Sequence, residues 1–480
     1  MSRHATNPWV VLVLICFAQF MVVLDATVVN VALPSIQKDL GLSEANLQWI
    51  INAYTLVFGG FLLLGGRAGD LLGRKRLFMF GLVVFTSASL LNGLAVNSGM
   101  LIGCRALQGL GAAFISPAAL AIITTTFEEG ADRAKALGVW AAIAIGGSAV
   151  GLIVGGALTQ LLSWPWIFFI NVPVGVTVFV LSLRLLPESR DEQAHRSFDV
   201  AGAVSVTGGL MTLVYAIVEA QEHGWTSART LGTFALAAVL LVAFCVIEQR
   251  SKAPLVRLSI FRVRSLRAAN ISMFLVASGL FAMFFFNTLY IQRVLGYGPL
   301  EAGLAFLPFT GGIMLSAGLA SKYAPKVGVR PIAIAGMLVT IAGMVYLTRI
   351  AVNGSYASDV LPALLLTALG LGAVFVPLTL IATTGLENED QGLASGIFNT
   401  SQQIGGALGL AILTSLAASK TTSVAGVSPQ AALVDGFHVA FAGGAAFMVI
   451  ALGAFLALLR QRDVVRIEAE AAEAVTAPTA

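Results

Sequence analysis

The sequence predicts an all-α membrane protein of fourteen transmembrane helices, arranged as two six-helix bundles with two extra helices inserted between them. Three observations lead to this fold class: an apolar composition, fourteen apolar segments of spanning length, and an internal repeat. Of the 480 residues, 58% are hydrophobic and only 11% are charged, and the mean hydropathy is +0.89. Soluble globular proteins carry about 25% charged residues, so most of this surface must face lipid.

Fourteen apolar segments are separated by charged or Pro- and Gly-rich points, and a span takes about 20 residues. They cover approximately residues 9–33, 47–66, 77–96, 100–125, 136–160, 166–186, 199–220, 230–248, 268–291, 302–321, 331–349, 360–383, 393–417 and 437–459. Segments of this length suit helices, which satisfy their own backbone groups in lipid, and they exclude lipid-exposed β structure. We expect the first segment to be a span rather than a cleaved signal peptide, because it is too long for a signal core.

The distribution of basic residues predicts the orientation of the chain. With a cytoplasmic N-terminus, 22 of the 28 Lys and Arg residues fall in inside segments, 5 in outside segments, and Arg105 within a span. An excess of cytoplasmic Lys and Arg is the positive-inside pattern. We therefore expect a multi-pass protein of the cytoplasmic (inner) membrane with both termini in the cytoplasm.

The chain repeats itself after about 260 residues. GLGAAFISPAALAIITTTF at 109–127 resembles GLGAVFVPLTLIATTGL at 370–386, and in each copy an acidic loop and a Gly-paired helix follow. Parallel repeats of this kind describe two halves of a transporter, with a binding site near the midplane between them. The predicted domains are 1–190 (helices 1–6), 191–262 (linker helices 7 and 8), 263–460 (helices 9–14) and a disordered cytoplasmic tail, 461–480.

The sequence lacks the motifs that are typical of several functional classes. Neither a G-x-x-x-x-G-K-[ST] phosphate loop nor an H-E-x-x-H metal pair is present, and no catalytic cluster is visible. We expect no enzymatic activity, no metal, no cofactor and no nucleic-acid partner. An ion gradient or simple diffusion must then drive transport.

Two ionisable residues lie well inside predicted spans, Asp25 in MVVLDATVVN and Arg105 in LIGCRALQGL. A charge within the bilayer costs at least about 3 kcal/mol and should face a partner or a cavity. By helix rise, Asp25 lies about 12 Å and Arg105 roughly 7–8 Å from the outer ends of their predicted helices. We predict that they interact; a snorkelling arginine and a plain interhelical contact of the acid are the alternatives.

Two further motifs concern gating and packing. GGRAGDLLGRKRL at 65–77 places Asp70 among basic residues in a short cytoplasmic turn, where an arginine or a helix N-terminus would be its partner. A positive-inside anchor is the alternative for the basic residues. Helix 5 carries a stripe of glycines that lets another helix approach closely or slide, and packing alone is the alternative; these glycines are Gly147, Gly151 and Gly155, with Gly146 and Gly156 beside them.

These motifs together resemble the major facilitator superfamily, and within it the fourteen-span drug:proton antiporters of the multidrug efflux type. GRAGDLLGRKR resembles the loop 2–3 signature, RALQGLGAA the helix-4 signature, and LDATVVNVALP, WPWIFFINVPVG and FDVAG the fourteen-span branch. The resemblance implies that Arg105 belongs to the proton-coupling machinery and that a gate forms against helix 13 near Gly392 to Gly396. The gating residues would be Gly66, Asp70, Gly73 and Arg74. The sequence departs from the family at Leu152, where the helix-5 signature has proline.

Other polar residues in or beside spans are candidates for the substrate cavity. They are Asn30, Tyr54, Gln108, Glu219, Asn287, Tyr290, Asn399 and Gln403. An interfacial acid is the alternative for Glu219, an interface anchor for Tyr54, and interhelical hydrogen bonds for the residues of helix 13.

We interpret the chain as a secondary active transporter that exports hydrophobic or cationic compounds in exchange for protons by alternating access. Burial favours the neutral form of a carboxyl group and a nearby arginine the ionised form, so a small movement at Asp25 could switch its protonation. Its partners would be a small substrate, the proton and membrane lipid, and we expect a monomer. A lipid or metabolite exporter without strict coupling, and a membrane sensor or scaffold, are the alternatives.

Overall fold

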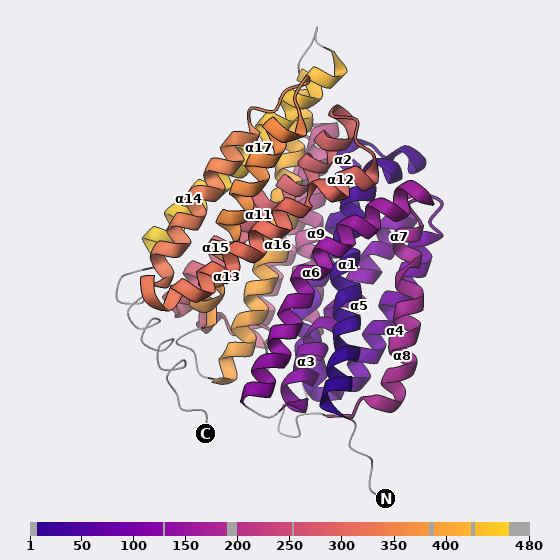
Figure 1. Ribbon diagram of the computed structural model, residues 1–480, viewed down its shortest axis with the longest axis vertical. Coiled ribbons are helices and arrows are strands. Elements are labelled where there is room, and N and C mark those ends of the chain that lie inside the picture. Colours follow the sequence, from indigo (N-terminus) through magenta and orange to yellow (C-terminus); the bar gives the residue numbers. More distant parts are fainter. Residues whose placement is uncertain are drawn as a thin grey trace, which may run out of the picture. The chain divides into compact units, whose positions relative to one another are not determined.

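The computed structural model describes residues 7–127, 130–189, 199–251, 254–383, 388–423 and 428–459. Within these ranges all regular secondary structure is helical (Figure 1). Thirteen helical runs are long and apolar enough to cross a membrane, and Gly146–Leu161 is a shorter apolar helix within the remaining predicted span. The predicted all-α membrane fold is therefore confirmed. The tail 461–480 lies outside the described residues.

The chain divides into two compact units. Unit 1 takes Met1–Leu42, Trp49–Gly209 and Leu240–Leu255, and unit 2 takes Ser43–Gln48, Leu210–Val239 and Val256–Ala480. The first unit contains α1 (Pro8–Leu40), α3 (Trp49–Leu72), α4 (Arg74–Gly93), α5 (Ser98–Thr126), α6 (Ala131–Leu161), α7 (Trp166–Phe169) and α8 (Asn171–Leu185). The domain boundaries at residues 190 and 262 stay a prediction.

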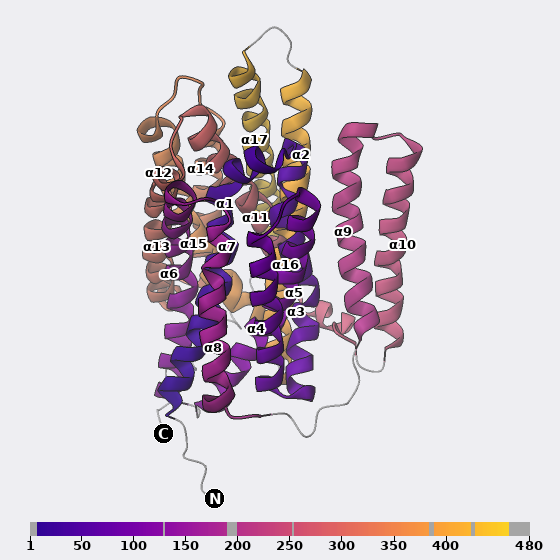
Figure 2. The same ribbon diagram turned by 90° about the vertical axis from the view of Figure 1, so that its right-hand side faces the viewer.

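The second unit contains α2 (Glu44–Leu47) and the C-terminal helices. These are α11 (Arg264–Leu289), α12 (Pro299–Ala305), α13 (Leu307–Val327), α14 (Val329–Leu347), α15 (Leu361–Thr383), α16 (Asn388–Ser423) and α17 (Pro429–Leu458). The helices α9 (Val200–His223) and α10 (Ala228–Arg250) are each divided between the units. Figure 2 shows these two helices side by side as a hairpin.

Helices at equivalent positions of the repeat pack against each other in both units. In unit 1, α5 contacts α3 and α4, α6 contacts α1, and α8 contacts α1 and α4. In unit 2, α15 contacts α13 and α14, α16 contacts α11, and α17 contacts α11 and α14. The sequence repeat thus corresponds to a repeat of helix packing.

Helix α1 is longer than the sequence predicts. Its start is set by Asn7, whose side chain accepts from Trp9 N at 2.9 Å, and it continues through Pro34 to Leu40. The predicted end at residue 33 is wrong, because a proline removes only one hydrogen-bond donor and a membrane helix tolerates it. The actual stop is Gly41, whose φ of 64° lies in the left-handed region that favours glycine.

The predicted glycine stripe packs α6 onto α1. A Cβ on Gly151 would overlap Thr27 Oγ1 and lie 3.1 Å from Leu24 O, and a Cβ on Gly155 would lie 2.9 Å from Val28 O. Gly147 approaches α1 less closely, and Gly156 is buried. In unit 2, Gly405 and Gly409 of α16 pack onto the α11 backbone in the same way. Close packing by the stripe is therefore present, whereas sliding along it stays a prediction.

The turn between α3 and α4 is held by the end of α8. Gly73 precedes α4 with a φ of 109°, and a Cβ there would press on the Glu188 carboxylate. Glu188 Oε1 accepts from Lys75 N at 3.1 Å, while Lys75 Nζ donates to Leu183 O and Leu186 O at 2.9 and 2.7 Å. Each helix end is thus capped by a side chain from the other segment.

We expect the Glu188→Ala variant to lose about 1 kcal/mol of stability, the usual value of an N-cap. Thermal unfolding of detergent-solubilised protein measures this loss. The Lys75→Ala variant should lose a similar amount of stability. The double variant should lose less than the sum of the two, because both caps join the same two segments. Strictly additive losses would show that the two caps are independent.

Candidate functional site

The functional side chains of unit 1 converge on one buried carboxylate. Asp25, in the middle of α1, is 0% exposed. Its Oδ2 accepts from Arg105 Nη1 at 2.5 Å, and its Oδ1 accepts from Gln108 Nε2 at 2.7 Å and from Asn171 Nδ2 at 2.9 Å. One cation and two amide donors therefore surround the carboxyl group, and they would compensate the cost of burying its negative charge.

The predicted contact between Asp25 and Arg105 is present. The predicted distance from Asp25 to the end of its helix is too short. Helix α1 runs on to Leu40, so Asp25 lies about 22 Å from the helix end at 1.5 Å per residue. Trp164 Nε1 donates to Asp39 Oδ2 at 2.7 Å and anchors this extension. A role of the pair in proton coupling stays a prediction.

Arg105 is held in place from three sides. It is 1% exposed, its Nε donates to Ile50 O at 3.0 Å, and its Nη1 also donates to Gln108 Oε1 at 2.7 Å. The guanidinium carbon lies 4.4 Å from the ring centroid of Tyr54, a cation–π distance. The alternative, in which Arg105 snorkels to the membrane surface, does not fit this buried side chain.

Gln108 connects the pair to α4. Its Oε1 accepts from Asn92 Nδ2 at 2.7 Å and its Nε2 donates to Ser89 Oγ at 3.2 Å. Gln108 therefore makes contacts through both ends of its amide. The side chain is fully buried in the network, and its place in a substrate cavity stays a prediction.

Asn171 completes the network and was not singled out from the sequence. It is the first residue of α8, directly after the short helix α7, and is 1% exposed. Its Nδ2 also donates to Ser89 Oγ at 3.0 Å, and Ser89 Oγ donates to Phe168 O at 2.9 Å. The predicted span 166–186 is thus two helices that meet beside Asp25.

The predicted gating residues are less fully described. The Asp70 side chain lies outside the described residues, so its partner stays a prediction. Arg74 N donates to Ser189 O at 2.9 Å. Gly66 has room for a Cβ, and the tight approach is made by its neighbour Gly65, where a Cβ would overlap Ala113 O.

Four of the other candidate cavity residues donate hydrogen bonds to backbone carbonyls of their own unit. Asn30 and Asn399 donate to carbonyls of their own helices, as does the buried Asn287, and Gln403 is half-buried. Tyr290 Oη donates to Ala351 O at 2.8 Å and anchors a loop. Substrate binding by these residues stays a prediction.

Glu219 has a partner across the α9–α10 hairpin. Its Oε1 accepts from Arg229 Nη2 at 2.8 Å and lies 3.0 Å from His223 Nδ1. The side chain is largely buried rather than simply exposed at the interface. The ion pair joins the two helices at this end of the hairpin.

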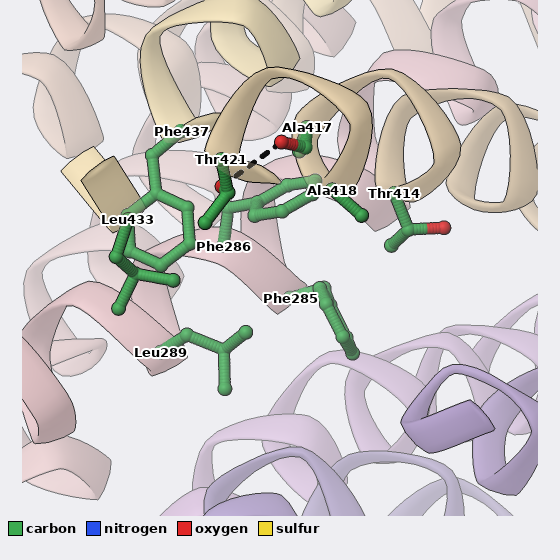
Figure 3. Close-up of a pocket in the computed structure, with 9 residues that line it drawn as sticks. All are labelled: Phe285, Phe286, Leu289, Thr414, Ala417, Ala418, Thr421, Leu433 and Phe437. Atoms are coloured by element: carbon green, nitrogen blue, oxygen red, sulfur yellow. Dashed lines mark hydrogen bonds between the residues drawn. The ribbon is translucent and has the colours of Figure 1, made fainter. Parts of the chain in front are cut away.

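Unit 2 has a small apolar pocket between α11, α16 and α17 (Figure 3). It is lined by Phe285, Phe286, Leu289, Thr414, Ala417, Ala418, Thr421, Leu433 and Phe437. Its volume of about 20 Å³ is far below the 300 Å³ or more of typical drug sites. None of the predicted cavity residues lines it.

The sequence and the fold match a known family. The model of the Major Facilitator Superfamily matches residues 15–410. The chain belongs to the Major Facilitator Superfamily. It is a multi-pass membrane transporter of that superfamily and not an enzyme.

Two characterised members are similar over most of their length. The puromycin resistance protein pur8 of Streptomyces alboniger is 42% identical over 443 residues, covering 90% of this chain and 88% of that protein. The cephamycin export protein CmcT of Amycolatopsis lactamdurans is 39% identical over 444 residues, covering 91% and 90%. Among solved structures, the nucleoside transporter NupG superposes with a TM-score of 0.68 at 11% identity, covering 95% of this facilitator and all of that chain. At this low identity, the similarity to NupG concerns the fold alone.

Proposed function

We propose that this facilitator exports hydrophobic compounds, cationic ones included, across the cytoplasmic membrane in exchange for protons. The observation that carries the proposal is the buried Asp25 carboxylate, paired with Arg105 at 2.5 Å inside a span. A charge in this place is costly, and its presence indicates a proton or ion pathway. Similarity to the puromycin resistance protein and to the cephamycin export protein supports export of small antibiotic-like compounds.

The network suggests how the exchange proceeds. In the conformation described, Asp25 is enclosed by three donors that suit its ionised form and that link α1 to α5 and α8. Protonation from the outside removes the negative charge that Arg105 needs, which favours a second arrangement of these helices. Release of the proton to the cytoplasm restores the pair, and the substrate is then carried outward as the transporter returns to its outward-open conformation. We infer the same orientation as the sequence predicts, with both termini cytoplasmic.

We expect the Asp25→Asn variant to fold and to lose proton-driven efflux, because the amide cannot change its charge. The measurement is efflux of a fluorescent dye from preloaded cells, with and without an uncoupler. Wild-type efflux should stop with the uncoupler, and efflux by the variant should stay at the background of cells that lack the protein. Full uncoupler-sensitive efflux by Asp25→Asn would refute the proposed role of this residue.

A further inference from the structure

The Asp25 carboxylate is surrounded by donors only. Arg105 donates to Oδ2, and Gln108 and Asn171 donate to Oδ1. The charged and titratable groups that face it are Arg105 and Tyr54. Of the other helices that contact α1, residues 136–161 of α6, all of α7, and α8 before Arg184 contain no ionisable side chain. A proton placed on Asp25 therefore needs an acceptor that the present arrangement does not offer.

An amide can supply that acceptor by turning over, since its oxygen then takes the place of its nitrogen. Gln108 is held at both ends: Nε2 donates to Asp25 and Ser89, and Oε1 accepts from Arg105 and Asn92. Turning it would break all four contacts. Asn171 donates through Nδ2 to Asp25 and Ser89, so turning it breaks two, and Ser89 Oγ keeps Gln108 as a donor.

We propose that Asn171 is the positioning residue that reads the protonation state of Asp25, donating to the carboxylate and turning to accept from the protonated carboxyl group. This inference rests on the proposed function. Because Asn171 begins α8, directly after α7, and shares Ser89 with the α7 carbonyl Phe168 O, turning its amide alters the contacts at the joint between these helices. Proton binding in α1 is thereby passed to the sixth span.

The test is the pH dependence of dye transport in proteoliposomes that contain the full-length protein. Asn171→Ala removes a charge-assisted hydrogen bond from the ionised state and a neutral one from the protonated state. The midpoint of the pH profile should therefore rise by about one pH unit. Asn171→Asp should raise it further, because two carboxyl groups at this distance share a proton. Asn353→Ala, at an exposed loop residue, is the matched control and should leave the profile unchanged.

If the Asn171 variants do not fold, the Ser89→Ala variant decides the test. It keeps Asn171 and removes the second acceptor of its amide, so the amide turns more easily and the midpoint should again rise. An unchanged midpoint in the folded variants, beside an inactive Asp25→Asn, would overturn the inference and leave the proposed function intact. Proton-driven transport by Asp25→Asn would instead overturn the proposed function itself.

Discussion

The Arg105→Ala variant should be destabilised by about 3–5 kcal/mol, because it leaves the Asp25 carboxylate buried without its cation. Asp25 is 0% and Arg105 1% exposed, so water cannot replace the lost partner in this conformation. The variant also removes the contacts to Ile50 O and Gln108. Thermal unfolding of the solubilised protein and the yield of monodisperse protein measure the loss.

The double variant Asp25→Asn/Arg105→Ala is the control for this prediction. It removes the charge that the single variant leaves unpaired, so it should be more stable than Arg105→Ala alone, although inactive in transport. A double-mutant cycle gives the interaction between the two residues. The account of the pair would be contradicted if the double variant were less stable than Arg105→Ala.

The Gly151→Val variant should lose about 3 kcal/mol and most of its transport activity, because the new side chain cannot fit against α1. A Cβ alone would already overlap Thr27 Oγ1 and approach the backbone of Leu24, the residue before Asp25. Overpacking a close helix contact costs about 1–3 kcal/mol, and here the obstacle includes backbone. The separation of α6 from α1 would also displace Asp25 from its donors.

Gly146→Val on the same helix is the matched control. A Cβ on Gly146 meets nothing within 4 Å, so this variant should unfold at nearly the wild-type temperature and export at nearly the wild-type rate. Equal losses in both variants would indicate that any valine in α6 is harmful, and that close packing on α1 is not the reason.

The fold and the central ion pair could be predicted from the sequence, each for a physical reason. Long apolar segments in lipid leave the backbone little choice other than helices. Asp25 and Arg105 are costly in a span, and opposite charges at similar depth have a strong reason to meet. The place of each helix in the repeat followed from the two copies of the Gly-rich segments.

The rest of the network could not be predicted in this way. Asn171, Ser89 and Asn92 are neutral, and such residues satisfy many alternative hydrogen bonds within spans, so nothing in their type indicates a shared partner. The predicted segment 9–33 ends just before Pro34, whereas the helix continues through this proline and ends at Gly41. The hydroxyl of Tyr290, a predicted cavity residue, donates to the loop carbonyl of Ala351, a contact that depends on tertiary structure.

The central claim is that Asp25 carries the exchanged proton, and substrate-induced proton movement in proteoliposomes tests it most directly. A pH-sensitive dye reports the lumenal pH when a transported drug is added, for the wild type, for Asp25→Asn and for Gly146→Val. We predict a pH change with the wild type and with Gly146→Val, and none with Asp25→Asn. A pH change of wild-type size with Asp25→Asn would contradict the account.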